Sequence, residues 1–180
     1  MYVCVHMCVC VCVCAYGFYY AMASRFPSYK IVLIGDTNTG KTTYANAIRG
    51  VPRQRTTPTM GANINEMVNN GVSYWLWDCA GDDRFAGLAD GYYLQANGAI
   101  IFATSEQNAA DWLMKLRRVC ETIPFVVVDP AMDSDEGEVY SPHTDRAFKD
   151  LATMMNVRAA ERAAIAAEKH AYTKRQRSTE

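Results

Sequence analysis

The sequence lacks an excess of charge of either sign. Its 180 residues include 18 lysines and arginines against 19 aspartates and glutamates, which gives a net charge of −1. This balance gives no indication of nucleic acid or of an anionic membrane as a partner. Half of the residues are hydrophobic, as in ordinary globular domains. The length suits one domain with a sizeable core.

Cysteine is scarce outside the first fourteen residues. Beyond them the chain has only Cys79 and Cys120, and two unpaired thiols in a cysteine-poor body indicate a reducing compartment rather than a disulfide scaffold. No cysteine follows Cys120, and neither Met1 nor Met22 precedes a glycine. The sequence therefore has no prenylation or myristoylation motif, and we expect no stable membrane anchor.

Residues 1–21 have no lysine or arginine and alternate valine with cysteine. A signal peptide would begin with basic residues. Because a repeated TG dinucleotide read in frame encodes Cys-Val, we interpret this segment as translated simple-sequence DNA, a spurious or disordered leader before a start at Met22. The alternatives are a membrane or targeting element, an exposed, aggregation-prone strand and a metal-binding tract.

Expected strands and helices alternate through the middle of the chain. Short apolar or β-branched runs predict buried strands, and apolar residues at helical spacing predict helices. Asn69-Asn70-Gly71 predicts a hairpin turn. This order indicates an α/β fold, a mostly parallel sheet flanked by helices with one antiparallel pair. The expected strands are 29–34, 63–67, 73–77, 99–103 and 124–128, and the expected helices are 41–49 and 109–121.

The C-terminal part of the chain has neither glycine nor proline from 143 to 180. Ser141-Pro142 predicts a helix start, and the alanine-rich segment 158–172 is strongly helical by composition. Residues 151–157 are compatible with a last edge strand or with more helix, and the pattern does not decide between them.

Residues 35–42 (GDTNTGKT) match the pattern G-x-x-x-x-G-K-[ST]. In such a loop the backbone N–H groups surround phosphate oxygens, the lysine reaches the β and γ phosphates, and the final hydroxyl binds Mg²⁺. The motif lies between an expected strand and an expected helix, whose positive dipole end faces the phosphates. We therefore expect a P-loop nucleoside-triphosphate site. Its predicted nucleotide-binding residues are Gly35, Asp36, Thr37, Asn38, Thr39, Gly40, Lys41, Thr42 and Thr43.

Four further segments carry a more specific resemblance. WDCAG at 77–81 resembles the W-D-T-A-G segment of small GTPases. FAGLADGYYLQANGAII at 85–101 and DWLMKLRRVCETIPFVV at 111–127 are similar to segments of the Ran family, and TPTMG at 57–61 resembles its first switch. The chain thus resembles the Ran family of small GTPases.

The resemblance covers roughly residues 28–133. It implies a P-loop small-GTPase fold for residues 22–180, with a degenerate helical part at 141–180. It implies GTP and GDP as ligands, Mg²⁺ as cofactor, and transport receptors or exchange factors of the Ran type as partners. It further implies a soluble monomer of the nucleus and cytoplasm that acts as a nucleotide switch in nucleocytoplasmic transport.

The resemblance also implies roles for single residues. Thr42 and Thr59 would bind Mg²⁺, and Asp78 would hold the metal through water. The Gly81 N–H would sense the γ-phosphate. Thr59 and Gly81 would then be the contacts by which the nucleotide orders two switch loops.

Two substitutions predict weak hydrolysis. Asp82 stands where the family has the glutamine that orients the attacking water, and a carboxylate accepts hydrogen bonds without donating one and repels the γ-phosphate. Thr37 replaces a glycine and crowds the space that this glutamine and an incoming arginine finger need. We expect the candidate catalytic residues, Lys41 and Asp82, to support little turnover.

The motif N-K-x-D that recognises guanine aligns with residues 130–133. Asp133 is still able to bond the N1 and N2 hydrogens of guanine. Pro130 cannot supply the amide, Ala131 cannot stack as the lysine does, and the later S-A-K motif has no clear counterpart. We expect a weakened preference for guanine.

Three functions remain open on these residues. The preferred one is a GTP-binding switch with weak or impaired hydrolysis. The second is a pseudo-GTPase, a binding module that presents a Ran-like surface without turnover. A P-loop phosphotransferase is less favoured, because no acceptor-site or lid sequence is visible.

Overall fold

The computed structural model describes residues 27–52, 54–120, 122–130 and 142–177. The expected leader 1–21 and Asp133 lie outside the described residues. In chain order the elements are β1 (Ser28–Gly35), α2 (Lys41–Ile48), β2 (Ala62–Asn69), β3 (Val72–Cys79), a 3₁₀ turn η1 (Asp83–Phe85), α3 (Ala86–Tyr93), β4 (Gly98–Phe102), α4 (Glu106–Arg117), β5 (Phe125–Val128) and α5 (Pro142–Arg177).

The strands form one sheet in the order β2-β3-β1-β4-β5. All neighbours are parallel except β2 and β3, which are antiparallel. The predicted hairpin turn is confirmed: Asn70 and Gly71 have φ values of 49° and 72°, the positive values that a type I′ turn requires. The expected α/β architecture with one antiparallel pair is therefore confirmed, and the structure places this pair at one edge of the sheet.

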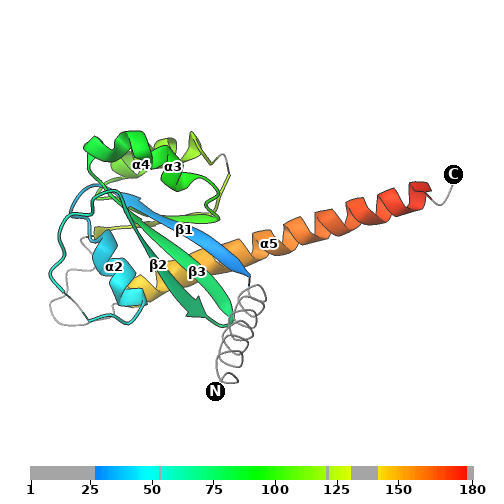
Figure 1. The fold of residues 1–180 in the computed structure, drawn as a ribbon, viewed down its shortest axis with the longest axis horizontal. Helices are drawn as coiled ribbons and strands as arrows, with labels where there is room; N and C mark the ends of the chain where they lie inside the picture. The colour runs from blue at the N-terminus through cyan, green and yellow to red at the C-terminus, as the bar shows by residue number, and fades with distance from the viewer. Residues whose placement is uncertain (1–26, 53, 121, 131–141, 178–180) are drawn as a thin grey trace, which may run out of the picture.

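Helices cover both faces of the sheet (Figure 1). Helices α2 and α5 pack on one face, and α3 and α4 lie on the other. The central strand β1 supplies both cores because successive side chains point to opposite faces. Ile31 and Leu33 face α2 and α5, whereas Val32 and Ile34 face the second core. This burial on both faces explains the unbroken apolar run of β1.

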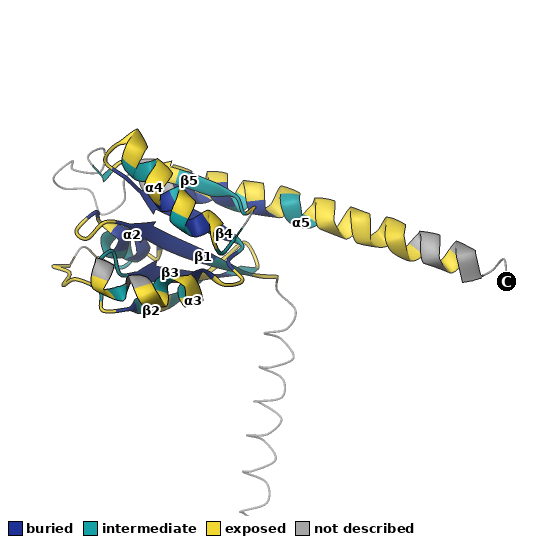
Figure 2. Ribbon diagram, turned by 90° about the horizontal axis from the view of Figure 1, so that it is seen from above, coloured by how far each residue is buried: buried dark blue, intermediate teal, exposed yellow. Residues whose placement is uncertain are grey.

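The segment 151–157, which the sequence left undecided, is part of helix α5. Leu151 and Met155, one helical turn apart, are buried against the sheet. Gly98 in β4 permits this approach, since a Cβ there would lie 2.8 Å from the Met155 sulfur. Within the described residues β5 is therefore the outer strand of the sheet. The far half of α5 runs beyond the sheet, and residues 160–170 in it are exposed to solvent (Figure 2).

Two helices differ from the sequence-based expectation. Helix α3 was not predicted, because Gly87 and Gly91 interrupt its pattern. Helix α4 starts and ends earlier than 109–121: the side chain of Ser105 caps its first turn, and the helix ends at Arg117 in a turn that leads to β5. Among the described residues, no helix combines the length and apolar character needed to cross a membrane.

Candidate functional site

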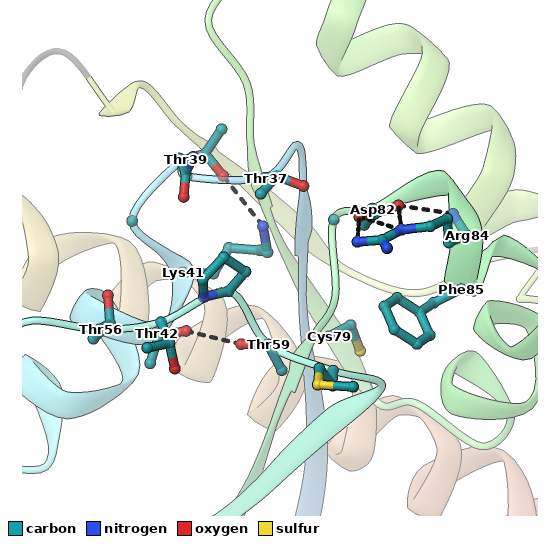
Figure 3. A pocket seen from close by; sticks show the side chains of 16 residues that line it. Thr37, Thr39, Lys41, Thr42, Thr56, Thr59, Cys79, Asp82, Arg84 and Phe85 are labelled. Carbon is teal, nitrogen blue, oxygen red and sulfur yellow. Dashed lines mark hydrogen bonds and ion pairs between the residues drawn. The ribbon is translucent and has the colours of Figure 1, made fainter.

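The phosphate-loop motif connects the central strand β1 to helix α2. Lys41, the first residue of α2, points back into the loop, where its Nζ donates to the carbonyl oxygens of Gly35 (2.9 Å) and Asp36 (2.6 Å). Its side chain is 6% exposed. Burial lowers the pKa of Lys41 below its ordinary value, against the opposing charges of Asp78 and Asp36. The P-loop lysine is thus positioned inside the loop (Figure 3).

Thr42, Thr59 and Asp78 meet beside this loop, although they come from three segments. The hydroxyl of Thr42 donates to Asp78 Oδ2 at 2.7 Å, and that of Thr59 donates to the same oxygen at 3.3 Å. The two hydroxyl oxygens are 3.2 Å apart, and a dashed line marks this contact in Figure 3. The structure therefore brings together the three residues predicted to hold Mg²⁺.

The chemistry of this cluster fits a small, hard cation. Asp78 is 1% exposed, and its Oδ1 accepts no hydrogen bond from the described part of the chain. Burial raises the pKa of Asp78, while the Thr42 hydroxyl and the Lys41 charge act against this rise. Two hydroxyls and one carboxylate provide oxygen ligands of the kind that Mg²⁺ binds together with the phosphates of a substrate.

Gly81 packs directly against the phosphate loop. A Cβ on Gly81 would lie 2.4 Å from the carbonyl oxygen of Gly35 and 2.4 Å from the carbonyl carbon of Asp36. Only glycine allows the segment after β3 to approach the loop backbone so closely. The predicted γ-phosphate sensor is therefore in contact with the loop that would hold the phosphates.

Asp82 is paired with Arg84, a contact that the sequence analysis missed. The guanidinium donates to both carboxylate oxygens at 2.6 to 3.1 Å, and the Arg84 backbone N–H donates to Oδ1 at 2.9 Å. Hydrogen bonds from Arg84 lower the pKa of Asp82, so this carboxylate stays ionised at neutral pH. Thr37, Asp82 and Arg84 line the same pocket as Lys41 (Figure 3).

Asp36 turns its side chain away from this pocket and toward α4. Its Oδ2 accepts from Asn108 Nδ2 at 2.8 Å, and its Oδ1 accepts from Trp112 Nε1 at 3.0 Å. These contacts span more than seventy residues of sequence, so no local pattern predicts them. Thr43 lies in the first turn of α2 and is not among the pocket-lining residues.

The pocket gathers the phosphate loop, the first switch and the segment after β3. The segment that aligns with the guanine motif follows β5. Of this segment the structure describes Pro130, which comes directly after Asp129, whereas residues 131–133 lie outside the described residues. The lining residues are Thr37, Asn38, Thr39, Gly40, Lys41, Thr42, Thr56, Thr57, Pro58, Thr59, Met60, Cys79, Gly81, Asp82, Arg84 and Phe85.

The phosphate loop follows the central parallel strand β1, and the Thr59 hydroxyl and the Asp78 carboxylate lie beside it. This arrangement defines a P-loop GTPase-like domain. Residues 30–133, more than half of the chain, match the family model described as Ras of Complex, Roc, domain of DAPkinase. The chain belongs to this family of Ras-superfamily GTPase domains. The match does not separate the Ran branch from other branches of the superfamily.

Proposed function

We propose that this protein binds GTP together with Mg²⁺ and acts as a nucleotide switch with weak hydrolysis. The main support is the convergence of Thr42, Thr59 and Asp78 beside Lys41. Thr59 comes from the segment between α2 and β2, and Gly81 from the segment after β3. A terminal phosphate bound at the loop would hold both segments, which is how nucleotide state changes surface shape in this class.

Each residue has a distinct role in this proposal. Lys41 leaves its two carbonyl partners to bind the β and γ phosphates. Thr42, Thr59 and Asp78 would hold Mg²⁺, which would supply charge neutralisation at the phosphates. The Gly81 N–H donates to the γ-phosphate from its position against the loop.

Weak hydrolysis follows from the residues around the terminal phosphate. Asp82 has no N–H donor, and its carboxylate is engaged by Arg84. It is therefore unsuited to orient a water for attack. Thr37, which lines the same pocket, adds a side chain where a helper's arginine would enter.

We also propose that the surface is of the Ran type. The segments that resemble the Ran family, 85–101 and 111–127, form α3, β4, α4 and the start of β5. Transport receptors or exchange factors of the Ran type are the proposed partners of a monomer in the nucleus and cytoplasm. Pull-down of transport receptors of the Ran type with the GTP-loaded chain, and not with the GDP-loaded chain, is the expected result.

A pseudo-GTPase is the second candidate, and the base side of the domain favours it. Pro130 stands at the first position of the guanine motif and cannot donate the side-chain amide that this position requires. In the described part of the chain β5 is an edge strand. No further strand among the described residues lies next to it that could be followed by a second base-binding loop. Such a protein would display the same surface without binding or turning over nucleotide.

Nucleotide analysis separates these candidates. The purified chain should release GTP or GDP on denaturation, and Lys41→Ala should release none. Single-turnover hydrolysis of bound GTP should proceed no faster than a slow intrinsic GTPase, about 10⁻⁴ s⁻¹. A parent chain that contains no nucleotide and binds none in the presence of Mg²⁺ is the result that supports the pseudo-GTPase instead.

A further inference from the structure

Asp36 is the one phosphate-loop residue whose side chain is held by a distant helix. Two donors from α4 converge on its two carboxylate oxygens, Asn108 at 2.8 Å and Trp112 at 3.0 Å. Hydrogen bonds to an ionised acceptor are stronger than neutral ones. Trp112 is 6% exposed, so one of the two donors belongs to the core.

The donors are fixed on their own helix. Asn108 and Trp112 are four residues apart, which places them on the same face of α4. The backbone N–H of Asn108 also donates to the capping side chain of Ser105. Asn108 and Trp112 thus present both donors to the carboxylate from one face of α4.

The backbone of Asp36 is a centre of contacts inside the loop. Its carbonyl oxygen accepts from Lys41 Nζ at 2.6 Å and from Thr39 Oγ1 at 2.8 Å. Its carbonyl carbon lies 2.4 Å from where a Cβ on Gly81 would stand. Movement of Asp36 would therefore displace the loop backbone together with the segment after β3 that packs against it.

We propose that the bonds from Asn108 and Trp112 to Asp36, here named the α4 latch, set the rate at which nucleotide leaves the phosphate loop. The inference rests on the proposed function and deepens it. Asp36 is a positioning residue: its side chain holds the loop to α4 and leaves the loop backbone to face the phosphates. Loss of the latch frees the Asp36 peptide and lowers the barrier to release.

Asn108 provides a conservative test of this role. Its Oδ1 is buried and has no hydrogen-bond partner in the described part of the chain. In Asp36→Asn, the new amide nitrogen is able to donate to this oxygen once the Asn108 amide rotates by half a turn, and Trp112 keeps its acceptor. Asp36→Ala removes both bonds. Asp36→Asn and Asp36→Ala both remove the negative charge, but only Asp36→Ala removes the hydrogen bonds to α4. Comparison of the two variants therefore separates the effect of the latch from the effect of the charge.

The experiment measures dissociation of a fluorescent GDP analogue in Mg²⁺, by chase with unlabelled GDP. Asp36→Ala and Asn108→Ala should each accelerate release, the former by about tenfold, and the double variant should release no faster than Asp36→Ala. Asp36→Asn should stay within about twofold of the parent chain. Gln107→Ala, which removes only an exposed contact with Asp111, is the matched control.

The outcomes are distinct. Equal release from Asp36→Ala and the parent, equal acceleration by Asp36→Asn, or additive effects of Asp36→Ala and Asn108→Ala would each overturn the latch. If the parent chain binds no labelled GDP, the proposed function fails as well. Melting temperatures of the nucleotide-free variants, expected to stay well above the temperature of the release measurement, exclude simple unfolding as the cause of faster release.

Discussion

The phosphate half and the base half of this domain differ in how much of a nucleotide site they retain. In the phosphate half, Thr42, Thr59 and Asp78 form one hydrogen-bonded cluster, and beside it Lys41 donates to the carbonyl oxygens of the loop. The proposed base half follows the edge strand β5 with Pro130, at the position that the Ran resemblance aligns with the asparagine of the guanine motif. In the proposed function, binding of phosphates and recognition of the base therefore rest on separate groups of residues, and one group is able to change while the other stays.

The largest expected effect concerns hydrolysis. Helper-assisted catalysis in this class is worth roughly 10⁵-fold and needs a positioned glutamine and an arginine finger together. We expect the parent chain to gain less than about tenfold from a Ran-type activating protein. The double variant Thr37→Gly with Asp82→Gln should raise stimulated single-turnover hydrolysis well above this. Stimulated turnover of several per second in the parent chain would contradict the assignment of both positions.

Lys41→Ala should cause the next largest effect. The lysine is the main cation of the phosphate half, and charge-assisted hydrogen bonds to phosphate are the strong ones. Affinity for a labelled triphosphate should fall roughly 100-fold or more, as measured by fluorescence titration. Lys169→Ala, on the exposed far half of α5, is the charge-matched control and should bind as the parent does. Equal affinities of the Lys41 variant and the parent would overturn the P-loop site.

Gly81→Ala should weaken the triphosphate state selectively. Its Cβ would lie within 2.4 Å of the loop backbone, so the segment after β3 has to move away. We expect about a tenfold loss of affinity for a non-hydrolysable GTP analogue and little loss for GDP. Gly87→Ala and Gly91→Ala, where a Cβ meets nothing within 4 Å, are the controls. An equal loss for both nucleotides would show that Gly81 serves the fold and not the switch.

Asp78→Asn should have the smallest effect, with opposite signs in the two states. Burial raises the pKa of Asp78 in the folded protein. Ionisation of this carboxyl therefore costs more in the folded than in the unfolded chain, and the nucleotide-free fold loses stability as the pH rises from about 4 through the raised pKa. The variant should therefore melt about 2–4 °C higher than the parent at neutral pH, and this gain should shrink near pH 4. With Mg²⁺ and GTP the parent should gain more stability than the variant. A variant that melts lower without nucleotide contradicts this balance.

The sequence predicted the phosphate half because its chemistry is local in sequence. Residues 35–42 form one continuous motif, and the fold confirms its strand–loop–helix context. The expected strands also appear, because a short, continuous apolar run such as 99–103 is typical of a strand that is buried on both faces. The switch residues Thr59 and Asp78 could be named only through the resemblance, and the structure brings them to Thr42.

Three features could not be predicted, for physical reasons. The glycines at 87 and 91 lower intrinsic helix propensity, and α3 forms because Tyr93 is buried in the core. The composition of residues 151–157 is compatible with a strand or a helix. The segment is helical in the structure, where Leu151 packs against Gly98 of β4. The bonds from α4 to Asp36 join distant segments, so no spacing rule could find them.

Parallel titrations with GTP, ATP and inorganic tripolyphosphate test the comparison of the two halves most directly. All three should bind in the presence of Mg²⁺ with dissociation constants within about 100-fold of one another. We expect this because the affinity resides in the phosphate half, whereas the base half lacks an amide and a stacking lysine, worth roughly 1–3 kcal/mol each. A thousandfold preference for GTP over both competitors would show instead that other residues have rebuilt the base site.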